Sequence, residues 1–171
     1  RYTERAANEH EALSERIREE GGEFDFRTEK NIRTLLLTAQ REARAYMNRV
    51  LDAGINVKII SGTRTYAEQN GLFRRGRFGN PGPKVTNARG GGSNHNFGIA
   101  WDIGIFTGAG GYVTEGAAYD RAAKAGAADS LEWGGGWTSF VDRPHYQLNV
   151  GLPMKTIRAR FEAGEKIVAN T

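Results

Sequence analysis

Alternating side-chain patterns in two short segments constrain the fold of this chain more than any other feature. In residues 99–106 large apolar side chains occupy every second position, and Asp102 falls on the opposite set; in residues 144–150 His145 and Gln147 alternate with apolar residues. Successive side chains of a strand point to opposite faces. Each segment is therefore predicted to be a strand with one face on the core, so that Asp102 and His145 share the polar face of neighbouring strands.

Helical spacing accounts for many of the remaining apolar residues. Between Ile32 and Val50 they recur at i, i+3, i+4 and i+7, which is typical of a helix with one wide apolar face. Thr65 and Glu68 have the spacing of a capping box, which opens a helix. Helices are expected over residues 32–50, 65–73, 115–129 and 153–161, with a strand over 57–60 and a long loop over 76–92. This layout predicts an α+β fold in which helices flank a small, mostly antiparallel sheet.

The length of 171 residues is that of one domain, or of one domain with an added arm. Residues 4–20 have the pattern of a charged helix with a thin apolar stripe. We therefore expect an N-terminal charged helical arm over residues 1–29, packed or partly solvated, and one domain over residues 30–171. The absence of cysteine excludes a disulfide scaffold, thiol catalysis and cysteine-ligated metals, and no apolar run is long enough for a membrane span.

The net charge of +4 and the pI near 9.5 leave the class of partner open. A basic chain fits a polyanion such as nucleic acid or an acidic cell-surface polymer. Interspersed surface charge explains the same balance, because the densest basic run is Arg74-Arg75 with Arg77. The sequence starts at Arg1 with no apolar signal segment in view, so localisation is left unknown.

Two of the three histidines stand at the entries of predicted strands. His10, the third, is interpreted as decoration of the charged helix, whereas His95 and His145 can meet Asp102. Two imidazoles and one carboxylate are a ligand set for catalytic zinc, which keeps a fourth position for water. A single histidine near glycines is more often structural, and two with an aspartate on a polar strand face are harder to explain in that way. The His-x6-Asp spacing is less specific than H-E-x-x-H, so a metal hydrolase and a structural role both stay open at this point.

Three separated motifs resemble a known family. They are Ser61-Gly-Thr-Arg64-Thr-Tyr66-Ala-Glu68-Gln69, Ser93-x-His95-x-x-Gly98-x-Ala100-x-Asp102 and Glu132-Trp-Gly-Gly-x-Trp137-x-x-Phe140-x-Asp142-x-Pro144-His145-Tyr-Gln147. In this order they are similar to the zinc D,D-carboxypeptidase and L-alanyl-D-glutamate endopeptidase family, which includes bacterial cell-wall peptidases and phage endolysins. The resemblance covers about residues 30–164.

The resemblance implies a fold like that of the hedgehog and D-Ala-D-Ala peptidase group, with residues 30–171 as the zinc peptidase domain. It also implies roles for single residues. The expected zinc ligands are His95, Asp102 and His145; the expected catalytic base is Asp142, and Arg64 polarises the scissile carbonyl; the expected substrate-binding residues are Ser93, Tyr66, Gln69 and Trp137. Glu132 has a poorer spacing to His145 than Asp142 has, so a supporting or structural role is expected for it.

These implications predict a monomeric zinc metallopeptidase that cuts the peptidoglycan stem peptide at the cell wall or in the periplasm. The L-alanyl-D-glutamate bond is the first expectation and D,D-carboxypeptidase activity the next, in a protein of phage or bacterial origin. No nucleic-acid or membrane partner is expected. The alternative is a catalytically inactive module that keeps the zinc and binds wall peptides or a protein. A nucleic-acid-binding domain has only the pI in its favour.

Overall fold

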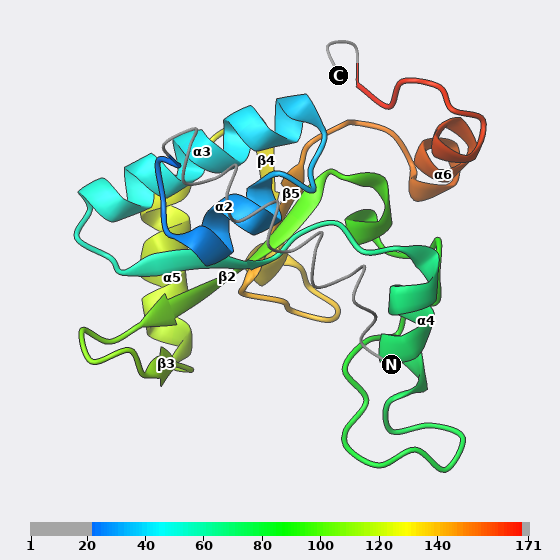
Figure 1. Cartoon of the computed structure of the whole chain (residues 1–171), viewed down its shortest axis with the longest axis horizontal. Helices are drawn as coiled ribbons and strands as arrows, with labels where there is room; N and C mark the ends of the chain where they lie inside the picture. The colour runs from blue at the N-terminus through cyan, green and yellow to red at the C-terminus, as the bar shows by residue number, and fades with distance from the viewer. Residues whose placement is uncertain (1–21, 169–171) are drawn as a thin grey trace, which may run out of the picture.

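The structure, a computed structural model, describes residues 22–168, in which helices surround an antiparallel sheet (Figure 1). The helices are α2 (Phe26–Ile32), α3 (Leu37–Asp52), α4 (Tyr66–Arg74), α5 (Gly116–Gly126) and α6 (Met154–Glu162), with 3-10 turns η1 (Asn94–Phe97) and η2 (Gly134–Gly136). The strands are β1 (Val57–Ser61), β2 (Ala100–Phe106), β3 (Tyr112–Val113), β4 (Leu131–Trp133) and β5 (His145–Leu148). The helix expected over residues 4–20 lies outside the described residues.

The sheet confirms the predicted α+β fold class. Its strand order is β1-β2-β5-β4, with β3 paired to β2, and every described pair is antiparallel. Asp102 of β2 stands directly opposite His145 of β5 on one side. On the other side an irregularity between Ile59 and Ser61 brings Ser61 of β1 opposite Asp102. The middle of β2 therefore carries Asp102 between two neighbouring strands.

The apolar face of the sheet is held by large aromatic side chains. Trp101 of β2 and Tyr146 of β5 are register partners and stack, with ring centroids 6.3 Å apart. Tyr46 of α3 covers them, with its ring centroid 4.4 Å from that of Tyr146. All three are buried, and aromatic side chains of this size dominate core energetics. Because the pleat alternates, this packing turns Asp102 and His145 toward the opposite face, as the sequence predicts.

The helix predicted over residues 32–50 is present from Leu37 onward, but its predicted start is wrong, because residues 33–36 are not helical. Helix α2 ends at Ile32, and α3 begins at Leu37 after Leu36 adopts an extended backbone. The Leu36 N–H bonds the Gly98 carbonyl oxygen at 2.9 Å, and the Thr34 hydroxyl accepts a bond from the Thr63 N–H at 2.8 Å. Both partners come from distant parts of the chain, and the Leu36 N–H bonds one of them in place of a carbonyl group one turn earlier. The apolar periodicity continues across the break, so the sequence pattern alone does not reveal it.

Helix α4 and the following loop project from the body of the protein (Figure 1). The predicted capping box is present at Thr65 and Glu68, and no regular element lies between Arg74 and Asn94, as the sequence predicts for residues 76–92. Arg77 fastens this loop, since its guanidinium donates to the carbonyl oxygens of Phe73 and Thr86 at 2.7 and 2.9 Å. No helix within residues 22–168 has both the length and the apolar character needed to cross a membrane.

Helix α2 contains residues 26–29, the C-terminal end of the arm expected over residues 1–29. Thr28 and Glu29 are fully buried. The Thr28 hydroxyl accepts a hydrogen bond from the Ile59 N–H at 3.0 Å, which joins α2 to β1. The arm and domain boundary between residues 29 and 30 stays a prediction.

Candidate metal centre

Three side chains from separate elements converge beside the middle of β2. Asp102 and His145 meet because they are opposite each other in the sheet, and His95 reaches them from η1, which Ser93 caps by accepting the His95 N–H at 3.3 Å. The Asp102 Oδ1 atom lies 3.2 Å from His95 Nε2 and 3.4 Å from His145 Nδ1. One donor atom of each lies within 4.8 Å of the others. These residues, called the His–Asp–His cluster below, could hold one metal ion.

Hydrogen bonds behind the rings decide which nitrogens face the centre. His95 Nδ1 lies 2.9 Å from the Gly62 carbonyl oxygen, and His145 Nε2 lies 2.8 Å from Gln147 Oε1. A carbonyl oxygen only accepts, so in a neutral ring the proton lies on the nitrogen that faces it. The lone pairs are then on His95 Nε2 and His145 Nδ1, the atoms that face Asp102. This donor set fits a tetrahedral zinc site with three protein ligands.

The electrostatics of the cluster favour charge on Asp102. Burial disfavours its carboxylate, but the positive charge and hydrogen bonding of His95 and His145 hold the pKa of Asp102 well below its ordinary value. Burial also opposes the imidazolium form of His145, yet the hydrogen bond and charge of Asp102 outweigh it and raise the pKa of His145. A buried anion between two imidazoles is suited to receive a cation.

Arg64, which is expected from the sequence to polarise the scissile carbonyl, lies at the edge of the cluster. Its Nη2 is 3.6 Å from Asp102 Oδ2, and its Nη1 donates to Gln69 Oε1 at 3.0 Å. The backbone of Arg64 is tied to the same region, because its N–H donates to the His95 carbonyl oxygen at 2.8 Å. Burial lowers the pKa of Arg64, with Asp102 and Asp142 acting in the opposite direction. Arginine still stays charged at neutral pH.

Asp142 and Glu132 take different places near His145. Asp142 lines the same cavity as His95 and His145. Burial raises its pKa, and the negative charge of Asp102 adds to that effect, a direction suited to a general base. Glu132 accepts hydrogen bonds from Trp137 Nε1 at 2.9 Å and Gln147 Nε2 at 3.0 Å. Glu132 is therefore hydrogen-bonded within a network behind the cavity, a placement that agrees with the supporting role expected for it.

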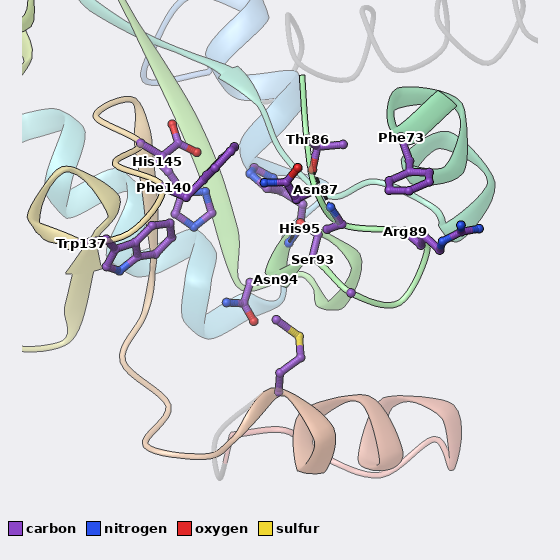
Figure 2. A pocket seen from close by; sticks show the side chains of 14 residues that line it. Phe73, Thr86, Asn87, Arg89, Ser93, Asn94, His95, Trp137, Phe140 and His145 are labelled. Carbon is purple, nitrogen blue, oxygen red and sulfur yellow. Dashed lines mark hydrogen bonds between the residues drawn. The ribbon is translucent and has the colours of Figure 1, made fainter. Parts of the chain in front are cut away.

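An open cavity of about 690 Å³ lies over the cluster. Figure 2 shows Trp137 and Phe73 on opposite sides of it, with His95 and His145 between them. The cavity is lined by Phe73, Thr86, Asn87, Ala88, Arg89, Gly92, Ser93, Asn94, His95, Trp137, Phe140, Asp142, His145 and Met154. Phe140 is 60% exposed at its rim and has a positive φ of 53°, which is uncommon for a bulky residue. The opening leaves room for a substrate chain beside the cluster.

The four expected substrate-binding residues are not all in this cavity. Ser93 and Trp137 line it, whereas Tyr66 and Gln69 do not. The Tyr66 hydroxyl donates to Glu162 Oε1 at 3.0 Å, and its ring packs on Phe97. Gln69 is fully buried and, besides accepting from Arg64, donates to the Ala88 carbonyl oxygen at 3.0 Å.

Two residues of the site were missed in the sequence interpretation. The two-residue alternation predicts that Gln147 lies beside His145 on the polar face of the strand, but it indicates no role for Gln147. Asn94 lines the cavity and donates to Gln147 Oε1 at 2.8 Å. Its position in a 3-10 turn leaves no periodic signal in the sequence, so only the structure finds it.

Known proteins are similar to this chain in sequence. Residues 86–148 match the family model described as D-alanyl-D-alanine carboxypeptidase. Over 106 residues the chain is 37% identical to the peptidoglycan L-alanyl-D-glutamate endopeptidase CwlK of Bacillus subtilis. That alignment covers 56% of this chain and 62% of CwlK, so the chain spans less than two thirds of that relative.

Solved structures extend the agreement to the fold. The L-Ala D-Glu endopeptidase ChiX of Serratia marcescens is 27% identical, with a TM-score of 0.59 over 75% of this chain and 90% of that one. The D,D-dipeptidase VanXYg, 18% identical, has a TM-score of 0.50 over 78% and 56% of the two chains and shares the fold. The family resemblance predicted from the sequence is thereby confirmed, since the matched segment contains the whole His–Asp–His cluster. The chain is thus similar to the D-alanyl-D-alanine carboxypeptidase family over residues 86–148, and to L-alanyl-D-glutamate endopeptidases in sequence and fold.

Proposed function

We propose that this protein is a zinc-dependent peptidase that hydrolyses an amide bond in the stem peptide of peptidoglycan. The observation that carries the proposal is the convergence of His95 Nε2, His145 Nδ1 and Asp102 Oδ1 beside an open cavity. Zinc suits two imidazoles and one carboxylate and, when bound, supplies a Lewis acid that acidifies water and polarises a carbonyl group. The names of CwlK and ChiX support the L-alanyl-D-glutamate bond as the target.

The protein side chains supply the proton transfer and the charge. Asp142, in the cavity wall, takes the proton of the attacking water and passes it to the leaving amine, for which its raised pKa is suited. Arg64 donates to the carbonyl oxygen as negative charge develops there. Ser93 and Trp137, which line the cavity, contact the bound peptide. Gln69 acts on Arg64 by holding its guanidinium.

The test is digestion of purified muropeptides by the full chain loaded with zinc, read by mass spectrometry. Cleavage of the L-alanyl-D-glutamate bond releases a peptide that begins with D-glutamate, whereas D,D-carboxypeptidase activity removes a single terminal D-alanine. Asp142→Asn should lower turnover by about 10² to 10⁴ with zinc still bound, because only the base is removed. His145→Ala should lose both zinc and turnover.

Two results would contradict the proposal. A zinc-loaded protein that leaves every muropeptide uncut would instead be the inactive binding module. Loss of zinc from the Asp142→Asn variant would show that this carboxylate is a ligand and that the assignment of ligands is wrong. Tight zinc binding in the parent protein, measured by competition with a chromophoric chelator, is required in either case.

A further inference from the structure

A chain of hydrogen bonds extends from His145 away from the metal centre. Gln147 Oε1 accepts from His145, and Gln147 Nε2 donates to Glu132 Oε2 at 3.0 Å. The other carboxylate oxygen of Glu132 accepts the Trp137 indole N–H at 2.9 Å. Glu132 of β4 and Gln147 of β5 are register partners, so the sheet itself places them together. These residues, with Asn94, form the supporting network.

The donor and acceptor properties of these groups allow only one orientation of the Gln147 amide. An ionised carboxylate only accepts hydrogen bonds, so the NH₂ group of Gln147 has to face Glu132. The amide oxygen of Gln147 then faces His145, where it also accepts from Asn94 Nδ2 at 2.8 Å. The reversed amide would place oxygen against the Glu132 carboxylate and an NH₂ group against that of Asn94. Glu132 therefore fixes the orientation of Gln147, and Gln147 requires a proton on His145 Nε2.

We infer that Glu132 and Gln147 are positioning residues that keep the lone pair of His145 on Nδ1, the nitrogen that faces the metal position. The inference rests on the proposed function, because it concerns the ligand that would bind zinc. Trp137 lines the cavity and its ring lies 5.1 Å from the His145 ring, centroid to centroid. The hydrogen bond from Trp137 to Glu132 thus connects the cavity wall to the supporting network that holds His145.

The two histidines differ in how they are held. His95 is held by the backbone carbonyl oxygen of Gly62. No side-chain substitution removes that acceptor. His145 depends on the side-chain oxygen of the buried Gln147, an acceptor that a substitution can remove. Without Gln147, the carboxylate of Asp102, 3.4 Å from His145 Nδ1, is the acceptor that remains. The proton should then move to Nδ1, where it competes with the metal.

The experiment compares Gln147→Leu and Glu132→Gln with the parent chain by two measurements. The first is zinc affinity by chelator competition, in which loss of a residue behind a metal-ligating histidine typically costs about 10- to 100-fold. The second is the His145 tautomer of the metal-free protein, from ¹⁵N NMR at a pH where both rings are neutral. We expect the proton on Nε2 in the parent chain and on Nδ1 in Gln147→Leu, with a smaller loss of affinity in Glu132→Gln, which keeps one acceptor oxygen.

The control is Asn149→Leu, the same change of amide to leucine at an exposed position just beyond the end of β5. It should leave affinity and tautomer unchanged. Parent-like zinc affinity and an unchanged tautomer in Gln147→Leu would overturn the inference. If that variant does not fold, Glu132→Gln decides alone, and parent-like affinity there is the contrary result. Zinc binding without peptide hydrolysis in the parent would refute the proposed function yet leave this comparison intact, since neither readout requires turnover.

Discussion

A single carboxylate organises the centre at the scale of residues. Asp102 presents Oδ1 to both imidazoles and Oδ2 to the Arg64 guanidinium. This arrangement fixes the position of a permanent cation relative to the ligand set. Gln69 holds the other terminal nitrogen of Arg64, while Arg64 Nε has no hydrogen-bond partner within residues 22–168 and is buried. Arg64 is therefore held from two sides at the edge of the site.

Removal of Arg64 should affect turnover more than metal binding. We expect Arg64→Ala to lower kcat by about 10²-fold on a muropeptide substrate, because a donor to the developing oxyanion is lost, and to change zinc affinity only a few-fold. Arg64→Lys should recover part of the rate, since a lysine keeps the charge but has no fork to reach Gln69 and Asp102 together. Steady-state kinetics and chelator competition measure both quantities. A near-normal rate in Arg64→Ala would remove this residue from the mechanism.

At the scale of elements, sequence patterns predict the structural features that depend on residues close together in the chain. The capping box at Thr65 and the alternation that places Asp102 opposite the core follow from short-range geometry, and both are present. The break at Leu36 depends on the Gly98 carbonyl group, far along the chain, and no local pattern encodes it. The same limit applies to the site. Ligand spacing indicates which side chains can meet, whereas the burial of Gln69 arises from contacts across the fold.

The packing of α2 on α3 should depend on pH through one ion pair. Arg44 donates to both oxygens of Glu29 at 2.8 Å, and Glu29 Oε1 also accepts the Phe24 N–H at 3.1 Å. Burial disfavours the Glu29 carboxylate, but these bonds outweigh it and lower its pKa below the unfolded value. The stabilisation is then complete above the unfolded-state pKa and is lost as the pH falls through the folded-state pKa.

We therefore expect Glu29→Gln to lower the free energy of unfolding by about 2 kcal/mol at neutral pH. The loss should be smaller than the roughly 3–5 kcal/mol of a fully buried pair, because the Arg44 side chain is 29% exposed. Urea unfolding across a pH series should show the difference shrinking in acid. Glu23→Gln, at the exposed acid 3.7 Å from Arg44, is the matched control and should cost under about 1 kcal/mol. A gap that stays constant with pH would contradict the assignment to Glu29.

At the scale of the whole molecule, the net charge resides in one region. Residues 69–101, called the basic lobe here, contain five basic residues and no acidic ones, whereas the chain as a whole has 24 and 20. Outside the lobe the charges nearly cancel. Arg74, Arg75, Lys84 and Arg89 are exposed, and residues 86–89 line the cavity over the His–Asp–His cluster. The positive electrostatic potential of the molecule is thus concentrated beside the cavity, where it favours the approach of an anionic polymer.

Reversal of charge on this lobe should slow attack on the whole cell wall, whose stem peptides carry carboxylates. We expect Arg74→Glu with Arg75→Glu to reduce the rate on intact sacculi about tenfold at low salt, with a much smaller effect on a short neutral peptide substrate. The difference should fade as salt rises, because exposed charges are screened over about 10 Å at 0.1 M ionic strength. Arg121→Glu with Lys124→Glu reverses two exposed charges on α5 and changes the net charge equally. Equal slowing by the two pairs would show that net charge, and not its placement beside the cavity, controls the encounter.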